Sequence, residues 1–272
     1  MMNHSRTGRS TAVFVAAIAA ALAATFGLTS CSSTGAGSTT SVVRIAAASD
    51  LVFALPEIAE LVQKEHPEIE MRITYGSSGQ FVQQISNGAP FDLYLSADVQ
   101  YARDLIDAGL AREDALFTYA LGRLAVWTTR DDLTMPLDVA ALAQPSIAKV
   151  AIANPRHAPY GRAAISALDR AGVLAAVEPR LVLGENVAQA AEFVATGAAD
   201  AGIVALSLLF SGALSDQGTW REVPIDEHDR IEQGGVVLTN AIDTEAAAAV
   251  ATVMQSPAGK EILRSYGFYE EG

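Results

Sequence analysis

The stretch VRIAAASDL at residues 43–51 gives the strongest indication of the fold. An apolar run that predicts a buried strand leads directly to Ser49, where we expect a helix to begin. The pattern recurs in MRITYGSSGQ at residues 71–80, where Ser78 follows the strand. The first N–H groups of a helix have no partner within the helix and lie at the positive end of its dipole. A hydroxyl beside them, among small residues, favours binding of an oxyanion.

Strands and helices alternate along the rest of the chain. We expect strands near residues 42–48, 70–75, 91–96, 122–128, 148–153, 180–183, 201–205 and 235–239. We expect helices to start near residues 50, 79, 98, 137, 160, 187, 207 and 244, with a last helix near 257–266. This order predicts an α/β protein with parallel sheets covered by helices on both faces. In such sheets ligands bind beyond the carboxyl ends of the strands, where Ser49 and Ser78 lie.

Pro56 makes the start of the first helix ambiguous, because a proline inside a helix costs about 3 kcal/mol. Either the helix begins near residue 50 and is kinked at Pro56, or Ser49 caps a short turn and the main helix begins at Pro56. The sequence leaves both alternatives open.

The first 41 residues differ in composition from the rest. Arg6 and Arg9 precede an alanine-rich apolar run over residues 12–28, which predicts a secretory signal. The run ends in LTSC at residues 28–31, which resembles the processing site of bacterial lipoproteins. We therefore predict a lipoprotein signal peptide over residues 1–30 with Cys31 as the lipid attachment site. An ordinary cleaved signal and an uncleaved membrane anchor are the alternatives. Residues 31–41, rich in Ser, Gly and Thr, predict a flexible tether.

The composition limits the class of function. The chain of 272 residues has a formal net charge of −13, which becomes −15 when Arg6 and Arg9 are removed with the signal. Such an acidic protein is a poor nucleic-acid binder, since phosphate affinity depends on Lys and Arg. A bound anion must instead be held by local dipoles and hydroxyls. Because Cys31 is the single cysteine, an internal disulfide and a multi-cysteine metal site are excluded.

Several short motifs, taken together and in order, resemble the molybdate-binding proteins of ABC importers. They are AAAS at 46–49, GSSG at 76–79, GAPFDLYLSAD at 88–98, NPRHAPYG at 154–161, GENV at 184–187, SPAGK at 256–260 and YGF at 266–268. The resemblance spans nearly all of residues 43–268. It implies a two-lobed type II periplasmic binding-protein fold with the ligand cleft between the lobes. Lobe 1 would comprise residues 42–121 and 228–272, and lobe 2 residues 122–227, with hinge crossings near 119–123 and 222–236.

The same resemblance implies a set of ligand-binding residues. Ser49 and Ser78 would supply hydroxyl and backbone N–H donors from the first lobe, and Tyr160 and Val187 backbone N–H donors from the second. Many members of the family add a tyrosine hydroxyl at the position of Ala205, so this chain lacks that donor. Without the family, a serine after a strand is most often only an N-cap, and Tyr160 and Val187 are ordinary packing residues.

The resemblance therefore implies a receptor rather than an enzyme. It would capture molybdate, and tungstate, for an ABC permease and its ATPase, on the outer face of the cell membrane or in the periplasm. Molybdenum would enter only as bound molybdate, without direct protein–metal ligands and without a cofactor, and we expect a monomer. The alternatives are a receptor of the same fold for sulfate or phosphate, and an extracytoplasmic hydrolase. No nucleophile, phosphate-loop or zinc-protease motif supports an enzyme.

Two further acidic residues and one acidic stretch carry local predictions. Asp92 and Asp98 flank an expected buried strand, where we expect each to cap a helix or to form local hydrogen bonds. The acidic stretch DEHD at residues 226–229 predicts a solvated loop.

Overall fold

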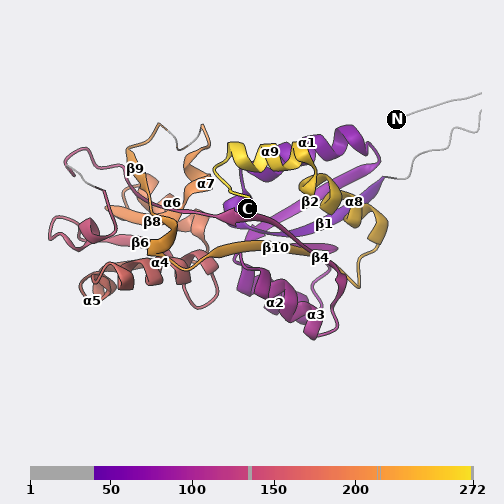
Figure 1. The fold of residues 1–272 in the computed structure, drawn as a ribbon, viewed down its shortest axis with the longest axis horizontal. Helices are drawn as coiled ribbons and strands as arrows, with labels where there is room; N and C mark the ends of the chain where they lie inside the picture. The colour runs from indigo at the N-terminus through magenta and orange to yellow at the C-terminus, as the bar shows by residue number, and fades with distance from the viewer. Residues whose placement is uncertain (1–39, 134–136, 213, 215, 271–272) are drawn as a thin grey trace, which may run out of the picture. The chain divides into compact units, whose positions relative to one another are not determined.

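Two mixed β-sheets organise the part of the chain that the structure describes (Figure 1). The structure is a computed structural model and describes residues 40–133, 137–212, 214 and 216–270. The first sheet, in the order β2-β1-β3-β10-β4, consists of β1 (Ser41–Ala48), β2 (Ile69–Gly76), β3 (Leu93–Ser96), β4 (Ala111–Gly122) and β10 (Ile231–Leu238). The second sheet, in the order β7-β6-β8-β5-β9, consists of β5 (Leu124–Thr128), β6 (Val150–Ala153), β7 (Leu181–Gly184), β8 (Ala201–Ala205) and β9 (Thr219–Glu222).

Strand directions follow the same rule in both sheets. β1 pairs in parallel with β2 and β3, and β6 pairs in parallel with β7 and β8. β10 and β5 run antiparallel to both of their neighbours. The expected two-lobed α/β fold with mostly parallel sheets is confirmed: each sheet is mixed only through one reversed strand, β10 or β5, and its other four strands run in the same direction.

Helices cover both sheets. Those packed with the first sheet are α1 (Ala54–Glu65), α2 (Ser78–Ser86), α3 (Val99–Asp107), α8 (Thr244–Gln255) and α9 (Pro257–Ser265). Those packed with the second sheet are α4 (Pro159–Arg170), α5 (Leu174–Val177), α6 (Val187–Ala195) and α7 (Leu206–Leu209). Short 3-10 turns are η1 (Ser49–Leu51), η2 (Ala140–Ala143), η3 (Glu178–Arg180) and η4 (Ile225–Glu227). In the structure, lobe 1 denotes the first sheet with its helices, and lobe 2 the second sheet with its helices.

The first sheet has a core on each face, which explains why β1, an interior strand, is apolar at every position except Ser41 and Arg44. Val43, Ile45 and Ala47 of β1 belong to the cluster that also includes buried residues of α1, α8 and α9. Ala46, which alternates with them, belongs to the cluster with buried residues of α2 and α3. Successive side chains of a strand point to opposite faces, so a strand buried on both faces needs apolar residues at every position.

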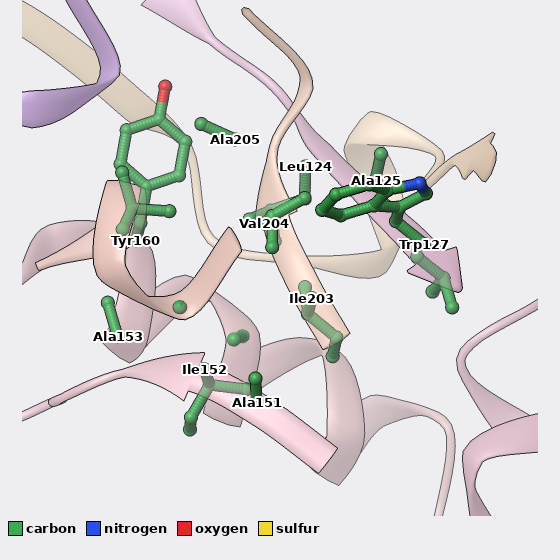
Figure 2. Packing of buried hydrophobic residues seen from close by; sticks show 14 of the residues in the cluster. Leu124, Ala125, Trp127, Ala151, Ile152, Ala153, Tyr160, Ile203, Val204 and Ala205 are labelled. Atoms are coloured by element: carbon green, nitrogen blue, oxygen red, sulfur yellow. The ribbon is translucent and has the colours of Figure 1, made fainter. Parts of the chain in front are cut away.

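The core of lobe 2 is a single cluster around β5, β6 and β8 (Figure 2). Trp127 of β5 is fully buried, and its indole Nε1 donates a hydrogen bond to the backbone oxygen of Gln217 at 2.7 Å. Tyr160 of α4 packs at the edge of this cluster, with its hydroxyl directed away from it (Figure 2). That hydroxyl is therefore free to contact residues outside the core of lobe 2.

The chain passes from one sheet to the other twice. Arg123 alone separates the end of β4 from the start of β5, and residues 223–230 lead from β9 back to β10. The single strand expected over residues 122–128 is therefore only β5, and β4 was missed. β4 lies at a sheet edge and begins with the charged residues Arg112, Glu113 and Asp114, a composition typical of protected edge strands. The short strand β9 was missed as well.

The helix expected near residue 137 is wrong. In its place lies η2, a 3-10 turn in which Asp138 Oδ1 accepts a hydrogen bond from the N–H of Ala141 at 2.8 Å. The turn ends at Gln144, which is extended because Pro145 follows it.

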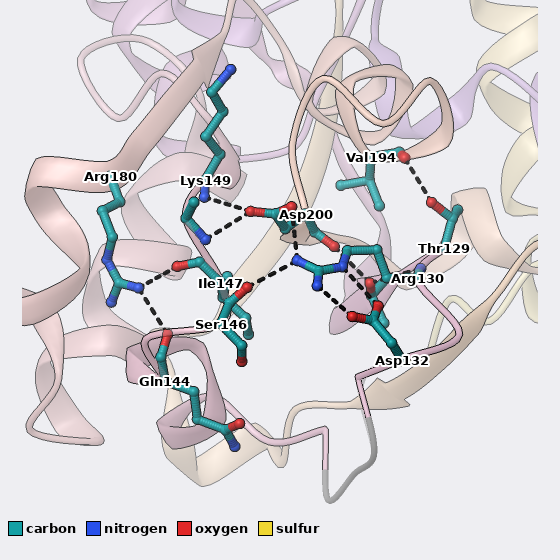
Figure 3. A network of polar contacts seen from close by, with 12 residues as sticks. Thr129, Arg130, Asp132, Gln144, Ser146, Ile147, Lys149, Arg180, Val194 and Asp200 are labelled. Carbon is teal, nitrogen blue, oxygen red and sulfur yellow. Dashed lines mark hydrogen bonds and ion pairs between the residues drawn. The ribbon is translucent and has the colours of Figure 1, made fainter.

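Two arginines fasten the segment after η2 (Figure 3). Arg180 donates to the backbone oxygens of Gln144 and Ile147, and Arg130 donates to Ser146 O at 2.9 Å. Arg130 also pairs with Asp200 at 3.0 Å. The segment is thus held by side chains rather than by helical hydrogen bonds.

The first helix is separate from the turn at Ser49, as in the second alternative left by Pro56, but the N-cap of that turn is Ala48 rather than Ser49. Ser49 begins the 3-10 turn η1, and α1 begins at Ala54, which places Pro56 in the first turn. The N–H groups of that turn have no intrahelical partner, so the missing proline donor costs little there. The expected signal peptide (1–30), Cys31 and most of the tether lie outside the described residues. No helix within the described residues is long and apolar enough to cross a membrane.

Candidate functional site

A small pocket lies where the carboxyl ends of strands from both sheets meet. It has a cavity volume of about 10 Å³ and is lined by residues 48–50, 76–78 and 97 from lobe 1 and by residues 158–160 and 186–187 from lobe 2. The four residues proposed from the sequence, Ser49, Ser78, Tyr160 and Val187, all lie on this lining. They are separated by up to 138 positions in the sequence, and the fold brings them together.

Lobe 1 contributes the two serines. Ser78 is the first residue of α2, and its Oγ accepts a hydrogen bond from the N–H of Ala97 at 3.0 Å. Ser49 Oγ accepts from the N–H of Ala188 in lobe 2 at 3.3 Å. Both serines are buried. A hydroxyl that accepts still has its own proton to donate, so each serine keeps a donor for a bound anion.

Lobe 2 contributes two helix starts. α4 begins with Pro159 and Tyr160, and α6 begins with Val187 after the N-cap Asn186. Asn186 Oδ1 accepts from the N–H of Gln189 at 3.0 Å, which fixes the first turn of α6. Proline at the first position of α4 has the backbone angle that a helix requires and no donor to leave unpaired. The N–H groups of Tyr160 and Val187 belong to first turns and lack intrahelical partners.

The lining carries one ionisable carboxyl group and, among its described residues, no Lys or Arg. Asp50, next to Ser49, is 1% exposed. Burial raises the pKa of its carboxyl group from 3.8 to about 6, although hydrogen bonds from Gln233 and Tyr160 act in the opposite direction. A dianion in the pocket would therefore be held by neutral donors, in the presence of an acid whose neutral form is favoured by burial.

Beside the pocket, the loop before α4 contacts the start of α2. His157 O accepts hydrogen bonds from the N–H of Gly79 at 2.9 Å and from Ser77 Oγ at 2.7 Å. The imidazole Nδ1 of His157 lies 2.9 Å from Ser77 Oγ. Ser77, not Ser78, is the N-cap residue of α2, but its hydroxyl is used for this contact between lobes rather than for capping.

A second group of contacts lies further out. Arg162 of α4 contacts the carboxylate of Asp98 at 2.5 Å and donates to Tyr101 Oη at 2.8 Å. Gln80 donates to Glu185 at 2.7 Å. We refer to the contacts made by His157, Arg162 and Glu185 with lobe 1 as the rim contacts. Together with the Ser49–Ala188 bond, they link the two lobes.

The local predictions for acidic residues have mixed outcomes. Asp98 caps α3 by accepting from the N–H of Gln100 at 2.9 Å, as expected. Asp92 accepts hydrogen bonds from Nε and Nη2 of Arg44, 48 positions away, so its contacts are not local. In the stretch expected to be a solvated loop, His228 is buried, and desolvation lowers the pKa of its imidazole.

Sequence reasoning missed Asp50, Gln233 and the contact role of His157. Asp50 had a detectable signal, since a single acid within an apolar strand–turn junction indicates a buried partner. Gln233 and His157 act through residues far away in the sequence, and no local pattern indicates them.

Two α/β lobes that meet over a small polar pocket are the architecture of a solute-binding protein. Residues 43–269 match the family described as bacterial extracellular solute-binding proteins. The molybdate-binding protein ModA of Rhodobacter capsulatus is 39% identical over 197 residues, which cover 72% of this chain and 76% of that protein. ModA of Azotobacter vinelandii is 34% identical over 226 residues, covering 83% and 89%.

The comparison of structures agrees. The periplasmic molybdate-binding protein of Azotobacter vinelandii superposes with a TM-score of 0.79 at 29% identity, over 85% of this chain and 100% of that one. This chain belongs to the bacterial extracellular solute-binding proteins and, within them, to the ModA family. The family resemblance derived from the sequence motifs is confirmed.

Proposed function

We propose that this protein captures molybdate, and also tungstate, outside the cytoplasm and delivers it to an ABC permease and its ATPase. The anion would bind between the lobes, and closure of the lobes about the two chain crossings would enclose it. The permease would then recognise the closed form. The protein would perform no catalysis.

One observation carries this proposal: donors from four separate segments converge on a single small pocket. At about 10 Å³, the cavity is far below the size of sites for drug-sized ligands, which start at about 300 Å³. Hydroxyl and N–H donors at helix starts suit an oxyanion, and hydrogen bonds to a charged acceptor are about twice as strong as neutral ones. The low dielectric of an enclosed pocket strengthens them further.

Selectivity would then depend on size. Because the lining offers neutral donors rather than a salt bridge, tetrahedral dianions of equal charge are distinguished mainly by how well they fill the pocket. Molybdate and tungstate are larger than sulfate and phosphate. This mechanism predicts good rejection of the smaller anions and poor separation of molybdate from tungstate.

Two further assignments are proposals that rest on the sequence. The lobes would comprise residues 42–121 with 228–272, and residues 122–227; the first sheet extends one residue beyond the bounds of lobe 1 at Ser41 and at Gly122. Cys31 would carry the lipid that anchors the protein to the membrane. Metabolic labelling with a radioactive fatty acid should label the wild-type protein and leave Cys31→Ala unlabelled; equal labelling of both would refute the anchor.

Calorimetric titration with molybdate, tungstate, sulfate and phosphate tests the function. We expect tight binding of the first two alone. Replacing Ser49 and Ser78 together by alanine should weaken molybdate binding at least ~100-fold, because two hydrogen bonds to a charged group contribute roughly 3–6 kcal/mol. Ser86→Ala, at the exposed end of the same helix α2, is the matched control. Tight sulfate or phosphate binding without a molybdate response would instead establish the alternative receptor.

A further inference from the structure

A buried polar triad lies behind the pocket. Tyr160 Oη donates a hydrogen bond to Asp50 Oδ2 at 2.9 Å, and Gln233 Nε2 donates to the same Oδ2 at 2.5 Å. Gln233 Nε2 also lies 3.0 Å from Tyr160 Oη. The three residues Asp50, Tyr160 and Gln233 are 1%, 2% and 0% exposed. Water therefore does not replace any of these bonds while the lobes are in contact.

The three residues come from three different parts of the fold. Asp50 follows β1 in lobe 1, Tyr160 is in the first turn of α4 in lobe 2, and Gln233 is in β10, the strand that returns from lobe 2. The other crossing is adjacent: a Cβ added to Gly122 would lie 2.4 Å from Tyr160 Oη and 2.8 Å from Gln233 Nε2. Because Asp50 and Tyr160 belong to different lobes, we expect a change in the angle between the lobes to alter the distance between their side chains.

Tyr160 thus has two separable parts. Its backbone N–H lies in the first turn of α4, on the pocket lining, whereas its phenol reaches across to lobe 1. Asp50 also has two separable parts: its backbone is adjacent to Ser49, and its carboxyl group faces the phenol of Tyr160. The triad therefore links the backbone of one set of proposed anion donors to the backbone of the other.

We propose that Asp50 is a positioning residue which, through the Tyr160 hydroxyl and with Gln233, clasps the two lobes and sets the start of α4 against the anion. This inference rests on the proposed anion site. The phenol reaches the carboxyl group while the lobes are in contact, and we expect opening of the lobes to separate the two groups.

The clasp also contains unfavourable buried polar atoms, which would help a receptor that must reopen. In the described part of the chain, Asp50 Oδ1 and Gln233 Oε1 are buried without a hydrogen-bond partner. Buried polar atoms without partners are unfavourable, and opening would return them to water. The clasp therefore favours closure through the bonds at Oδ2, while the unpaired oxygens favour opening.

Tyr160→Phe tests the clasp, because it removes the phenolic oxygen and leaves the backbone N–H. We expect molybdate affinity, measured by calorimetry on the purified protein, to fall at least ~10-fold, mainly through faster dissociation. The matched control is Tyr119→Phe: Tyr119 Oη is also buried, but it donates to Ser96 O at 3.0 Å within lobe 1. This variant should lose thermal stability and keep wild-type affinity.

A double-mutant cycle separates the clasp from a general loss of stability. The effect of Tyr160→Phe should persist in an Asp50→Asn background, where an acceptor oxygen remains, and vanish in an Asp50→Ala background. Wild-type affinity in Tyr160→Phe, or an equal loss in both backgrounds, would overturn the clasp alone. Wild-type protein that does not bind molybdate would overturn the proposed function and the clasp together, a result distinct from either.

Discussion

Two sets of contacts join the lobes, and they differ in burial, in charge and in the type of interaction. The clasp of Asp50, Tyr160 and Gln233 is fully buried, contains no cation and depends on hydrogen-bond geometry. The rim contacts are partly exposed and include an ion pair: the side chains of Arg162 and Asp98 are 40% and 30% exposed. Both sets bring together residues that are more than 60 positions apart in the sequence.

This difference indicates that the rim and the clasp have separate roles during closure of the lobes. Exposed ion pairs are worth little, about 0–1 kcal/mol, and salt screens them. Buried hydrogen bonds to a charged group contribute about 1.5–3 kcal/mol and depend closely on position. We therefore expect the rim to affect how easily the lobes meet, and the clasp to determine how long they stay closed. Variants at the rim and in the clasp can test these roles separately.

The largest effect is expected from blocking the rim sterically. A Cβ added at Gly79 would lie 2.7 Å from both His157 O and Tyr101 Oη, so Gly79→Ala pushes against backbone of the opposite lobe. Overpacking of this kind costs about 1–3 kcal/mol, which corresponds to a loss of molybdate affinity of roughly 5- to 150-fold. Calorimetry gives the affinity, and small-angle scattering with molybdate should show incomplete closure.

Gly212→Ala is the control for this prediction, because a Cβ there meets no atom within 4 Å. If Gly79→Ala binds and closes like wild type, the lobes do not meet at the rim in the bound form. The comparison between rim and clasp would then lose its basis.

The next largest effect is expected from the pH, through protonation of the Asp50 carboxyl group in the clasp. Burial raises the pKa of Asp50 to about 6 in the closed form, whereas a solvated Asp has a pKa near 3.9. Between these values the closed form retains a proton that the open form releases, so closure strengthens as the pH falls and its dependence levels off above about pH 6. We expect molybdate affinity to rise about tenfold from about pH 7 to about pH 5.

Asp50→Asn is the appropriate comparison for this pH profile. The variant keeps His228 and all other titratable groups, so the difference between the two profiles isolates Asp50. Its affinity should vary much less over the same range. Parallel profiles for the two proteins would mean that Asp50 does not titrate on closure.

The sequence predicted the pocket lining better than the clasp behind it, and the reason is physical. Ser49, Ser78, Tyr160 and Val187 stand at junctions of strand and helix, where local rules predict free N–H groups and the family motifs are short and ordered. The role of Asp50 and Gln233 depends on the contact between them, and they are 183 positions apart in the sequence. A single sequence carries no signal for such a contact.

The same reasoning explains the errors in the fold. β1 is apolar except at Ser41 and Arg44 and was predicted. β4 begins with a charged run at residues 112–114, and β9 has only the four residues TWRE, so the start of neither strand has an apolar pattern. The segment after Asp138 has the apolar spacing of a helix, yet Pro145 ends it after one turn, and the distant Arg130 and Arg180 hold the residues on its C-terminal side. Such arginine contacts depend on the tertiary structure, which local propensity does not contain.

The smallest effect is expected from the rim ion pair. Arg162→Met keeps most of the aliphatic side chain and removes the contacts with Asp98 and Tyr101. Because the pair is partly exposed, molybdate dissociation should accelerate only about 2- to 5-fold, and about 1 M salt should abolish the difference from wild type. Arg72→Met, which removes an exposed pair with Glu70 within lobe 1, controls for the loss of one positive charge.

Arg162→Met, compared with Tyr160→Phe, also tests which contact region, the rim or the clasp, contributes more to the stability of the closed form. Tyr160→Phe should keep its effect at about 1 M salt, because the clasp is buried and screening acts mainly on exposed charges. If Arg162→Met instead accelerates dissociation more than Tyr160→Phe does, and does so at high salt, the rim stabilises the closed form and the clasp is secondary. Stopped-flow measurement of molybdate dissociation from both variants, at low and at high salt, decides between the two possibilities. If the clasp stabilises the closed form, Tyr160→Phe releases molybdate faster and only Arg162→Met depends on salt. If the rim does, Arg162→Met releases it faster and keeps its effect at high salt.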